Sequence, residues 1–170
     1  MKKGELEIYR RRLPHWRLKE SIYFITWRLH PSQYELNPEE RDIIPWVVKH
    51  FDGKRYDLFA YVVMHDHIHA LVKPAEKYTL SQVVHSWKSF SANRLQRQFN
   101  RRNCVWQDEY FDRIVRDEAE LLEKAQYIIN NPFKVWPEVE EYPWVGGTLV
   151  EVAGRDARPT TEARPTSEIL

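Results

Sequence analysis

Two histidines separated by one residue form the clearest chemical pattern in this chain. His67 and His69 flank Ile68 in an apolar run typical of a β-strand. Successive side chains of a strand point to opposite faces, so the two imidazoles would project from one face, about 6–7 Å apart. Ile68, Ala70 and Val72 would form an apolar row on the other face. Two imidazoles on an open face, backed by a buried one, form half of a divalent-metal site.

A tyrosine and an asparagine later in the chain could complete such a site. The segment after Asp117 is expected to be helical, and its apolar stripe comprises Leu121, Leu122, Ala125, Ile128 and Ile129. At about 100° per residue, Tyr127 projects well away from the centre of that stripe, and Asn131 follows on the same side one turn later. If this side meets the histidines, they and Asn131 would surround a cation, with the phenol of Tyr127 beside it. Nitrogen and oxygen ligands without thiolates suit Mg²⁺ or Mn²⁺ about as well as Zn²⁺.

The composition limits the alternatives. The 170 residues carry 26 basic and 25 acidic side chains, a net charge of +1, so a basic surface for a nucleic acid would have to be local. The single cysteine, Cys104, excludes an internal disulfide and a cysteine-rich zinc site. No run approaches the roughly 18 apolar residues of a membrane span, and no signal peptide is recognisable. We therefore expect a cytoplasmic protein with one folded domain.

Apolar patterns and capping residues predict four strands and three helices. The strands are expected over 22–29, 55–64, 67–73 and near 110–115. The helices are expected over 38–51, 79–100 and 117–130. The order β-α-β-β-α-β-α predicts an α+β fold, a ferredoxin-like (RRM/palm-like) antiparallel sheet of four to five strands with helices mainly on one face. Such packing would leave the other face of the sheet free for a site.

Prolines and strand alternation add local expectations. Pro45 would kink or split the first helix, and the sequence Asn130-Asn131-Pro132 would end the third. On the strand over 55–64, one face would carry Leu58, Ala60 and Val62, and the other Phe59, Tyr61 and Val63. Because both faces are apolar, this strand is expected to be central in the sheet.

The two ends of the chain differ from its middle. Residues 1–148 are expected to form the functional domain. Residues 149–170 form a tail rich in Pro, Thr and Arg, in which Ala-Arg-Pro-Thr occurs at 157–160 and again at 163–166. The tail has too few apolar residues to bury, so we expect it to be disordered.

Longer stretches around the site residues resemble a known family. The run from Tyr61 to Val72 is similar to the His-hydrophobic-His motif of HUH single-strand nucleases. Among these it resembles the IS200-like, single-tyrosine transposases associated with repetitive extragenic palindromes (REP). Other segments resemble the same family in the same order, namely 12–16, 87–92, 106–113, 127–132 and 142–144. The resemblance covers the chain from about residue 10 to residue 148.

The resemblance implies a metal-dependent transposase that cleaves and rejoins single-stranded DNA. His67, His69 and Asn131 would bind Mg²⁺ or Mn²⁺. Tyr127 would attack the scissile phosphate and leave a 5′-phosphotyrosine and a free 3′-hydroxyl. The expected partner is single-stranded DNA that carries a hairpin, such as a REP palindrome. The REP-associated branch resembles monomers, with a dimer as the alternative.

Clustered basic residues are the candidates for further DNA contacts. Arg10, Arg11 and Arg12 could form an N-terminal arm. A second set lies on or just past the helix over 79–100 and comprises Lys88, Arg94, Arg97, Arg101 and Arg102. Within it, Arg94, Arg97 and Arg101 recur at a spacing that would place them on one side of a helix. They could meet phosphates, or they could form an ordinary solvated face.

Several alternatives stay open at this stage. The third histidine, His65, could join the metal site, accept a proton or simply occupy the turn, which is the reading we favour. Asn130 could replace Asn131 as ligand, and Trp106 and Gln107 are expected to pack rather than react. Two rival functions are a ferredoxin-like nucleic-acid-binding module without catalysis, and a zinc hydrolase that uses His65 with the other two histidines. A turn at His65 and Asp66 would spoil the geometry of the second.

Overall fold

The chain folds around a five-stranded antiparallel sheet. The computed structural model describes residues 21–150. Its elements are β1 (Ile22–Arg28), α1 (Pro38–Lys49), β2 (Tyr56–Val63), β3 (His67–Pro74), α2 (Leu80–Phe99), β4 (Phe111–Val115), α3 (Glu118–Val135) and β5 (Val145–Gly146). The strand order is β4-β1-β3-β2-β5, and every neighbouring pair is antiparallel. This arrangement confirms the predicted α+β class and the ferredoxin-like order of its first four strands.

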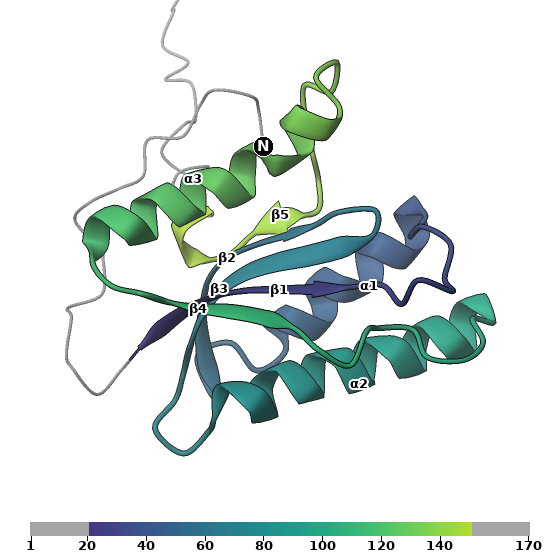
Figure 1. The fold of residues 1–170 in the computed structure, drawn as a ribbon, viewed down its shortest axis with the longest axis horizontal. Helices are drawn as coiled ribbons and strands as arrows, with labels where there is room; N and C mark the ends of the chain where they lie inside the picture. Colours follow the sequence, from purple (N-terminus) through teal and green to yellow (C-terminus); the bar gives the residue numbers. More distant parts are fainter. Residues whose placement is uncertain (1–20, 151–170) are drawn as a thin grey trace, which may run out of the picture.

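Helices cover both faces of the sheet, though unequally. In Figure 1, α1 and α2 lie together on one side of the strands and α3 lies on the other. Each side has its own buried cluster: Ile44 and Trp87 belong to the cluster under α1 and α2, and Leu121 and Ile128 to the cluster under α3. The sequence predicted that the second face of the sheet would be free. This prediction was wrong, because the apolar stripe of α3 packs on part of that face.

A bulge changes the predicted faces of β2. The pairing between β2 and β3 shifts register between Leu58 and Ala60. As a result, Leu58 belongs to the cluster under α1 and α2, whereas Ala60 and Val62 belong to the cluster under α3. The prediction that Leu58, Ala60 and Val62 share one face was wrong, because the extra residue at the bulge inverts the alternation of the residues that follow it. Both faces of β2 are apolar as predicted.

The helices begin where their capping residues predict, but the prolines act differently. Asn37 and Thr79 each form a reciprocal capping box at the start of α1 and α2. Pro45 lies inside α1, which is not split. The predicted end of α3 was also wrong, because the helix runs through Pro132 to Val135. Proline removes only one helical hydrogen bond, and the burial of Phe133 in the cluster under α3 favours continuing the helix.

The folded part extends slightly beyond the predicted boundary. Leu149 and Val150 are buried in the cluster under α3, so the fold reaches at least Val150 rather than residue 148. Residues 1–20 and 151–170, including the arm of Arg10, Arg11 and Arg12 and most of the predicted tail, lie outside the described residues. Within 21–150, no helix has the length and apolar character needed to span a membrane.

Candidate active site

His67 and His69 lie side by side on the face of the sheet that α3 partly covers. Both belong to β3, and their ring centroids are 4.7 Å apart. Ile68, Ala70 and Val72 point to the opposite face and belong to the cluster under α1 and α2, as the alternation predicts. The histidine face is less open than expected, because His69 retains only 5% of its accessible surface.

Each imidazole is oriented through its Nδ1 atom. His67 Nδ1 lies 2.5 Å from Asp66 Oδ1, and His69 Nδ1 lies 2.6 Å from Thr26 Oγ1. The Nε2 atom is therefore the one that each ring offers to a ligand. His69 Nε2 is buried and has no hydrogen-bond partner among the described residues. An orphaned buried nitrogen costs free energy unless something binds it, so this pair fits a metal ion held by two Nε2 atoms.

The environment keeps both imidazoles neutral at physiological pH. Burial, the largest cause, lowers the pKa of His69 to about 3, and repulsion from Arg28 and from the protonated form of His67 acts in the same direction. Burial also lowers the pKa of His67, although the carboxylate of Asp66 opposes this effect. Burial alone would raise the pKa of Asp66, but its hydrogen bond with His67 and the nearby positive charges lower it overall. Neutral imidazoles beside an ionised carboxylate are the forms that metal binding requires.

Tyr127 comes from α3 and lies directly beside this pair. Its ring centroid is 5.4 Å from that of His69 and 6.0 Å from that of Phe24. The Lys134 Nζ atom lies 4.9 Å from the centre of the Tyr127 ring. The tyrosine is 38% exposed, so a ligand can approach its phenol from solvent. The structure thus brings together a phenol and two imidazoles from distant parts of the sequence.

Asn131 lies one helical turn beyond Tyr127 and is buried. Tyr127 lies beside His69, and Trp136, at the end of α3, lies 5.2 Å from His65. The last turns of α3 therefore run along β3 from His69 toward the turn that precedes it. Along the helix, the turn of α3 that carries Asn131 falls between these two contacts.

His65 does not join the other two histidines. It lies in the tight turn between β2 and β3, which is closed by a hydrogen bond from Met64 N to the His67 carbonyl. Its ring centroid is 6.4 Å from that of His67, and it packs against Trp136. In residues 21–150, no three His, Cys, Asp or Glu side chains are grouped so that they could hold a metal ion. The three-histidine zinc site is therefore wrong, and the turn predicted for His65 is confirmed.

An open groove leads from solvent to Tyr127 and His69. Its volume is about 580 Å³, and its walls include Phe24, Thr26, Arg28 and Phe111. Thr26, Arg28 and Phe111 cannot be identified from the sequence alone, because their place depends on how the strands pair. Asp66 was assigned only to the turn, although its position next to His67 in the sequence was a usable signal.

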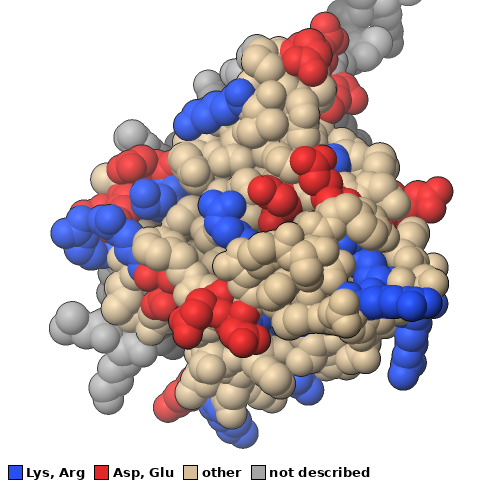
Figure 2. Space-filling view, turned by 45° about the vertical axis from the view of Figure 1, so that its right-hand side comes forward, with Lys and Arg blue, Asp and Glu red and all other residues tan. Residues whose placement is uncertain are grey.

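The basic residues predicted to bind DNA are in different situations. Arg94 and Arg97 line a second groove, of about 510 Å³, along α2, and the guanidinium of Arg94 lies 4.3 Å from the Trp46 ring. Lys88 Nζ donates a hydrogen bond to the carbonyl of Asp108. On the face drawn in Figure 2, basic and acidic side chains are interspersed, so any phosphate contact is local.

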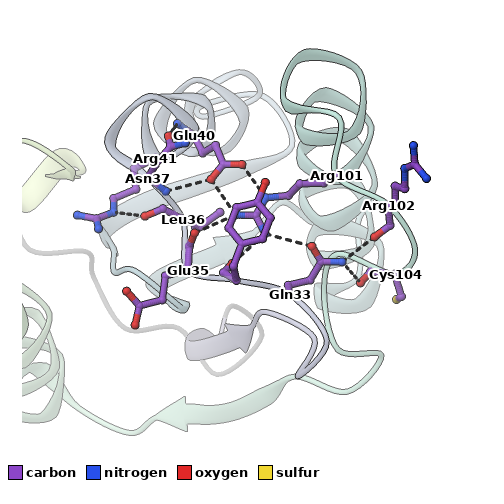
Figure 3. A network of polar contacts seen from close by, with 10 residues as sticks. Gln33, Glu35, Leu36, Asn37, Glu40, Arg41, Arg101, Arg102 and Cys104 are labelled. Carbon is purple, nitrogen blue, oxygen red and sulfur yellow. Dashed lines mark hydrogen bonds and ion pairs between the residues drawn. The ribbon is translucent and has the colours of Figure 1, made fainter.

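Arg101 is a correction to the predicted DNA-binding set. Its side chain is fully buried and forms two 2.7 Å hydrogen bonds with the Glu40 carboxylate, as Figure 3 shows. It also donates to the carbonyls of Tyr34 and Glu35 and to the side chain of Gln33. The prediction extended the helix past its end: α2 stops at Phe99, and the chain turns back before Arg101. Arg101 therefore ties this loop to α1 and is not available to a phosphate.

Trp106 packs as predicted, whereas Gln107 both packs and lines the groove. Trp106 is buried and donates to Ser91 Oγ at 2.9 Å, and Gln107 Nε2 donates to the carbonyl of Leu29 at 3.1 Å. Together with the bridge between Leu29 and Trp106, these bonds fix the segment that precedes the groove.

Comparisons with known proteins bear on the family and the fold. Residues 33–131, more than half of the chain, match the family described as transposase IS200 like. A solved structure of a REP-associated tyrosine transposase bound to a REP hairpin is 17% identical over 92% of this chain and 93% of its own, with a TM-score of 0.67. A second, a crystal structure described as a transposase from Deinococcus radiodurans R1, is 22% identical over 76% of this chain and 97% of its own, with a TM-score of 0.48. No curated protein sequence matches the chain.

Proposed function

The chain belongs to the IS200-like transposase family, and on this basis we propose that it cleaves and rejoins single-stranded DNA through Tyr127. The observation that carries the proposal is the contact between Tyr127 and His69, which come from α3 and β3. A solved relative with the same fold is bound to a REP hairpin. We extend that class of DNA to this chain and propose that its substrates are single strands that carry a palindromic hairpin.

The residues that would hold a divalent ion are His67, His69 and Asn131. Two Nε2 atoms and one amide oxygen leave positions open for water and phosphate, which suits Mg²⁺ or Mn²⁺. When bound, such an ion supplies Lewis-acid stabilisation of the charge that grows on the scissile phosphate. Asp66 and Thr26 orient the two imidazoles, because each engages the Nδ1 atom of its neighbour.

Tyr127 is the proposed nucleophile. Its Oη atom loses a proton and forms a bond to phosphorus, while the bond from phosphorus to the 3′ oxygen breaks and that oxygen takes up a proton. The products are a 5′-phosphotyrosine and a free 3′-hydroxyl. Because the phosphoester bond is conserved on Tyr127, a 3′-hydroxyl from another strand can reverse the step without ATP. His69 and Phe24 hold the tyrosine ring at the edge of the groove, where such a strand can reach it.

The site is contained in one chain. Tyr127 and both histidines belong to the same protomer, and no residue of a second copy is needed to bring them together. This supports a monomer as the active form. The rival function, a nucleic-acid-binding module without catalysis, has no use for a buried unpaired imidazole nitrogen beside a tyrosine.

A cleavage assay tests the proposal. The protein is incubated with hairpin-bearing single-stranded oligonucleotides and Mg²⁺ or Mn²⁺. We expect cut DNA and a covalent protein–DNA band that disappears in Tyr127→Phe. Tyr34→Phe is the matched control, because Tyr34 is 61% exposed and does not line the groove. Retention of DNA without cutting would favour the binding module, and cutting by Tyr127→Phe would exclude the tyrosyl intermediate.

A further inference from the structure

The pairing of the strands places an exposed aromatic residue in the same row as His69. Thr26 on β1 is directly opposite His69 on β3 and, on its other side, directly opposite Phe111 on β4. Directly opposed residues of antiparallel strands project from the same face. One row across three strands therefore contains Phe111, Thr26 and His69. The Cα atoms of Phe111 and His69 are two strand spacings apart, about 10 Å.

A neighbouring row carries a positive charge. Arg28 on β1 is directly opposite His67 on β3, so both side chains are on the histidine face. Arg28 is exposed and lines the groove. It makes no ion pair with any described residue. Glu109, at the rim, is the one acidic side chain among the groove's lining residues.

Phe111 lies on the histidine face of the sheet, but its side chain is exposed to solvent and is not part of the core. It retains 57% of its accessible surface and is part of the groove wall that continues to Tyr127. An aromatic ring at the rim of a nucleic-acid site has a clear physical use, because every base has a flat face that can stack on it. A single strand allows such stacking, whereas a duplex keeps its bases paired inside.

We propose that Phe111 and Arg28 bind the unpaired nucleotide next to the scissile phosphate, Phe111 by stacking on its base and Arg28 by contacting a phosphate. The inference rests on the proposed function, since it takes the scissile phosphate to lie at the histidines and Tyr127. The distance between Phe111 and His69 then matches the reach from a phosphate, through its sugar, to the base. This subsite selects for a single-stranded flank beside the hairpin and tolerates several bases, because stacking is not base-specific.

Binding measurements without a metal ion test this subsite apart from cleavage. The probe is a hairpin oligonucleotide with a single-stranded flank, in which abasic sites are placed one position at a time, and affinity is read by fluorescence anisotropy in EDTA. Phe111→Ala should weaken binding of the intact probe about tenfold. One abasic position should have the same effect in the unaltered protein and no further effect in Phe111→Ala. Phe111→Trp should restore the affinity.

Ile114→Ala is the matched control for stability and surface loss. Ile114 lies on the same strand, is 51% exposed, and is opposite Tyr23, on the other face of the sheet. The Ile114→Ala variant should bind the intact probe with the same affinity as the unaltered protein. For Arg28→Ala, the salt dependence of binding should fall by the equivalent of about one phosphate contact, a change of about 0.7 in the slope.

Three results would contradict the proposed roles of Phe111 and Arg28. Phe111→Ala binding as tightly as Ile114→Ala, or an abasic penalty that is the same with and without Phe111, would remove Phe111 from the DNA path. An unchanged salt slope for Arg28→Ala would remove the phosphate contact. Absence of cleavage by the unaltered protein would refute the proposed function but leave these binding results readable.

Discussion

The buried ion pair between Arg101 and Glu40 allows the sharpest test of the fold. Neither side chain has any accessible surface, and the two share a pair of 2.7 Å hydrogen bonds (Figure 3). Replacing Arg101 with Met removes the cation but leaves the carboxylate buried. It also leaves the carbonyls of Tyr34 and Glu35 without this donor.

The expected cost is large because a buried charge loses its partner. Breaking a buried ion pair from one side typically costs about 3–5 kcal/mol. In a protein of this size, each kcal/mol lowers the melting temperature by about 2–4 °C, so Arg101→Met should melt on the order of 10 °C lower. The double variant Arg101→Met with Glu40→Leu should recover much of this loss, because no uncompensated charge remains. It should not recover all of it, since Glu40 also accepts the Asn37 N–H at the start of α1.

Urea denaturation and thermal melts measure these changes, with Arg97→Ala as the control. Arg97 is exposed on α2, so its loss should change stability by no more than about 0.5 kcal/mol. Two results would refute the reasoning. One is an Arg101→Met protein of normal stability but weak DNA binding, which would restore the phosphate-binding role. The other is a double variant that is less stable than Arg101→Met alone.

Three further predictions concern the site and its surroundings. The pKa of His69 is about 3 in the folded protein, compared with 6.5 for an unperturbed histidine. Below about pH 6.5 the unfolded state therefore binds more protons than the folded state, and the free energy of unfolding decreases as the pH is lowered. Relative to His69→Gln, the metal-free protein should lose on the order of 2 kcal/mol between about pH 7 and pH 5 in urea melts, and a constant difference would contradict the shift. Asp66→Asn should weaken Mn²⁺ binding about 10- to 100-fold in an EPR titration, because His67 loses its orienting carboxylate; equal affinity would exclude that role. Arg97→Ala should weaken DNA binding for all sequences alike and lower the salt slope by about one contact, and an unchanged slope would place the groove along α2 outside the DNA path.

Local periodicity accounts for what the sequence predicts well. The shared face of His67 and His69 follows from the alternation of a strand, and the shared side of Tyr127 and Asn131 from the pitch of a helix. The start of α1 follows from the capping residue Asn37. These features depend on a few neighbouring residues, so they are visible without the rest of the fold.

Features that depend on long-range pairing are not predictable in this way. The contact between Thr26 and His69 and the row that includes Phe111 require the register of β1 with β3 and β4. The burial of His69 requires knowing where α3 packs. Arg101 was misassigned because the helical spacing was continued past Asn100, whose left-handed backbone, with φ of 54°, ends α2. An asparagine at that position is itself a signal for a helix end.

The most direct test of the central claim is to place the ion and Tyr127 in one measurement. NMR spectra of protein with labelled tyrosines are recorded as Mn²⁺ is added, with the Tyr127 signal assigned from Tyr127→Phe. The account predicts that the Tyr127 ring signal broadens strongly, that Tyr56 on the opposite face of the sheet broadens much less, and that His69→Ala abolishes the effect. A Tyr127 signal that stays sharp while Mn²⁺ occupies the histidines, or histidines that bind no Mn²⁺, would contradict it.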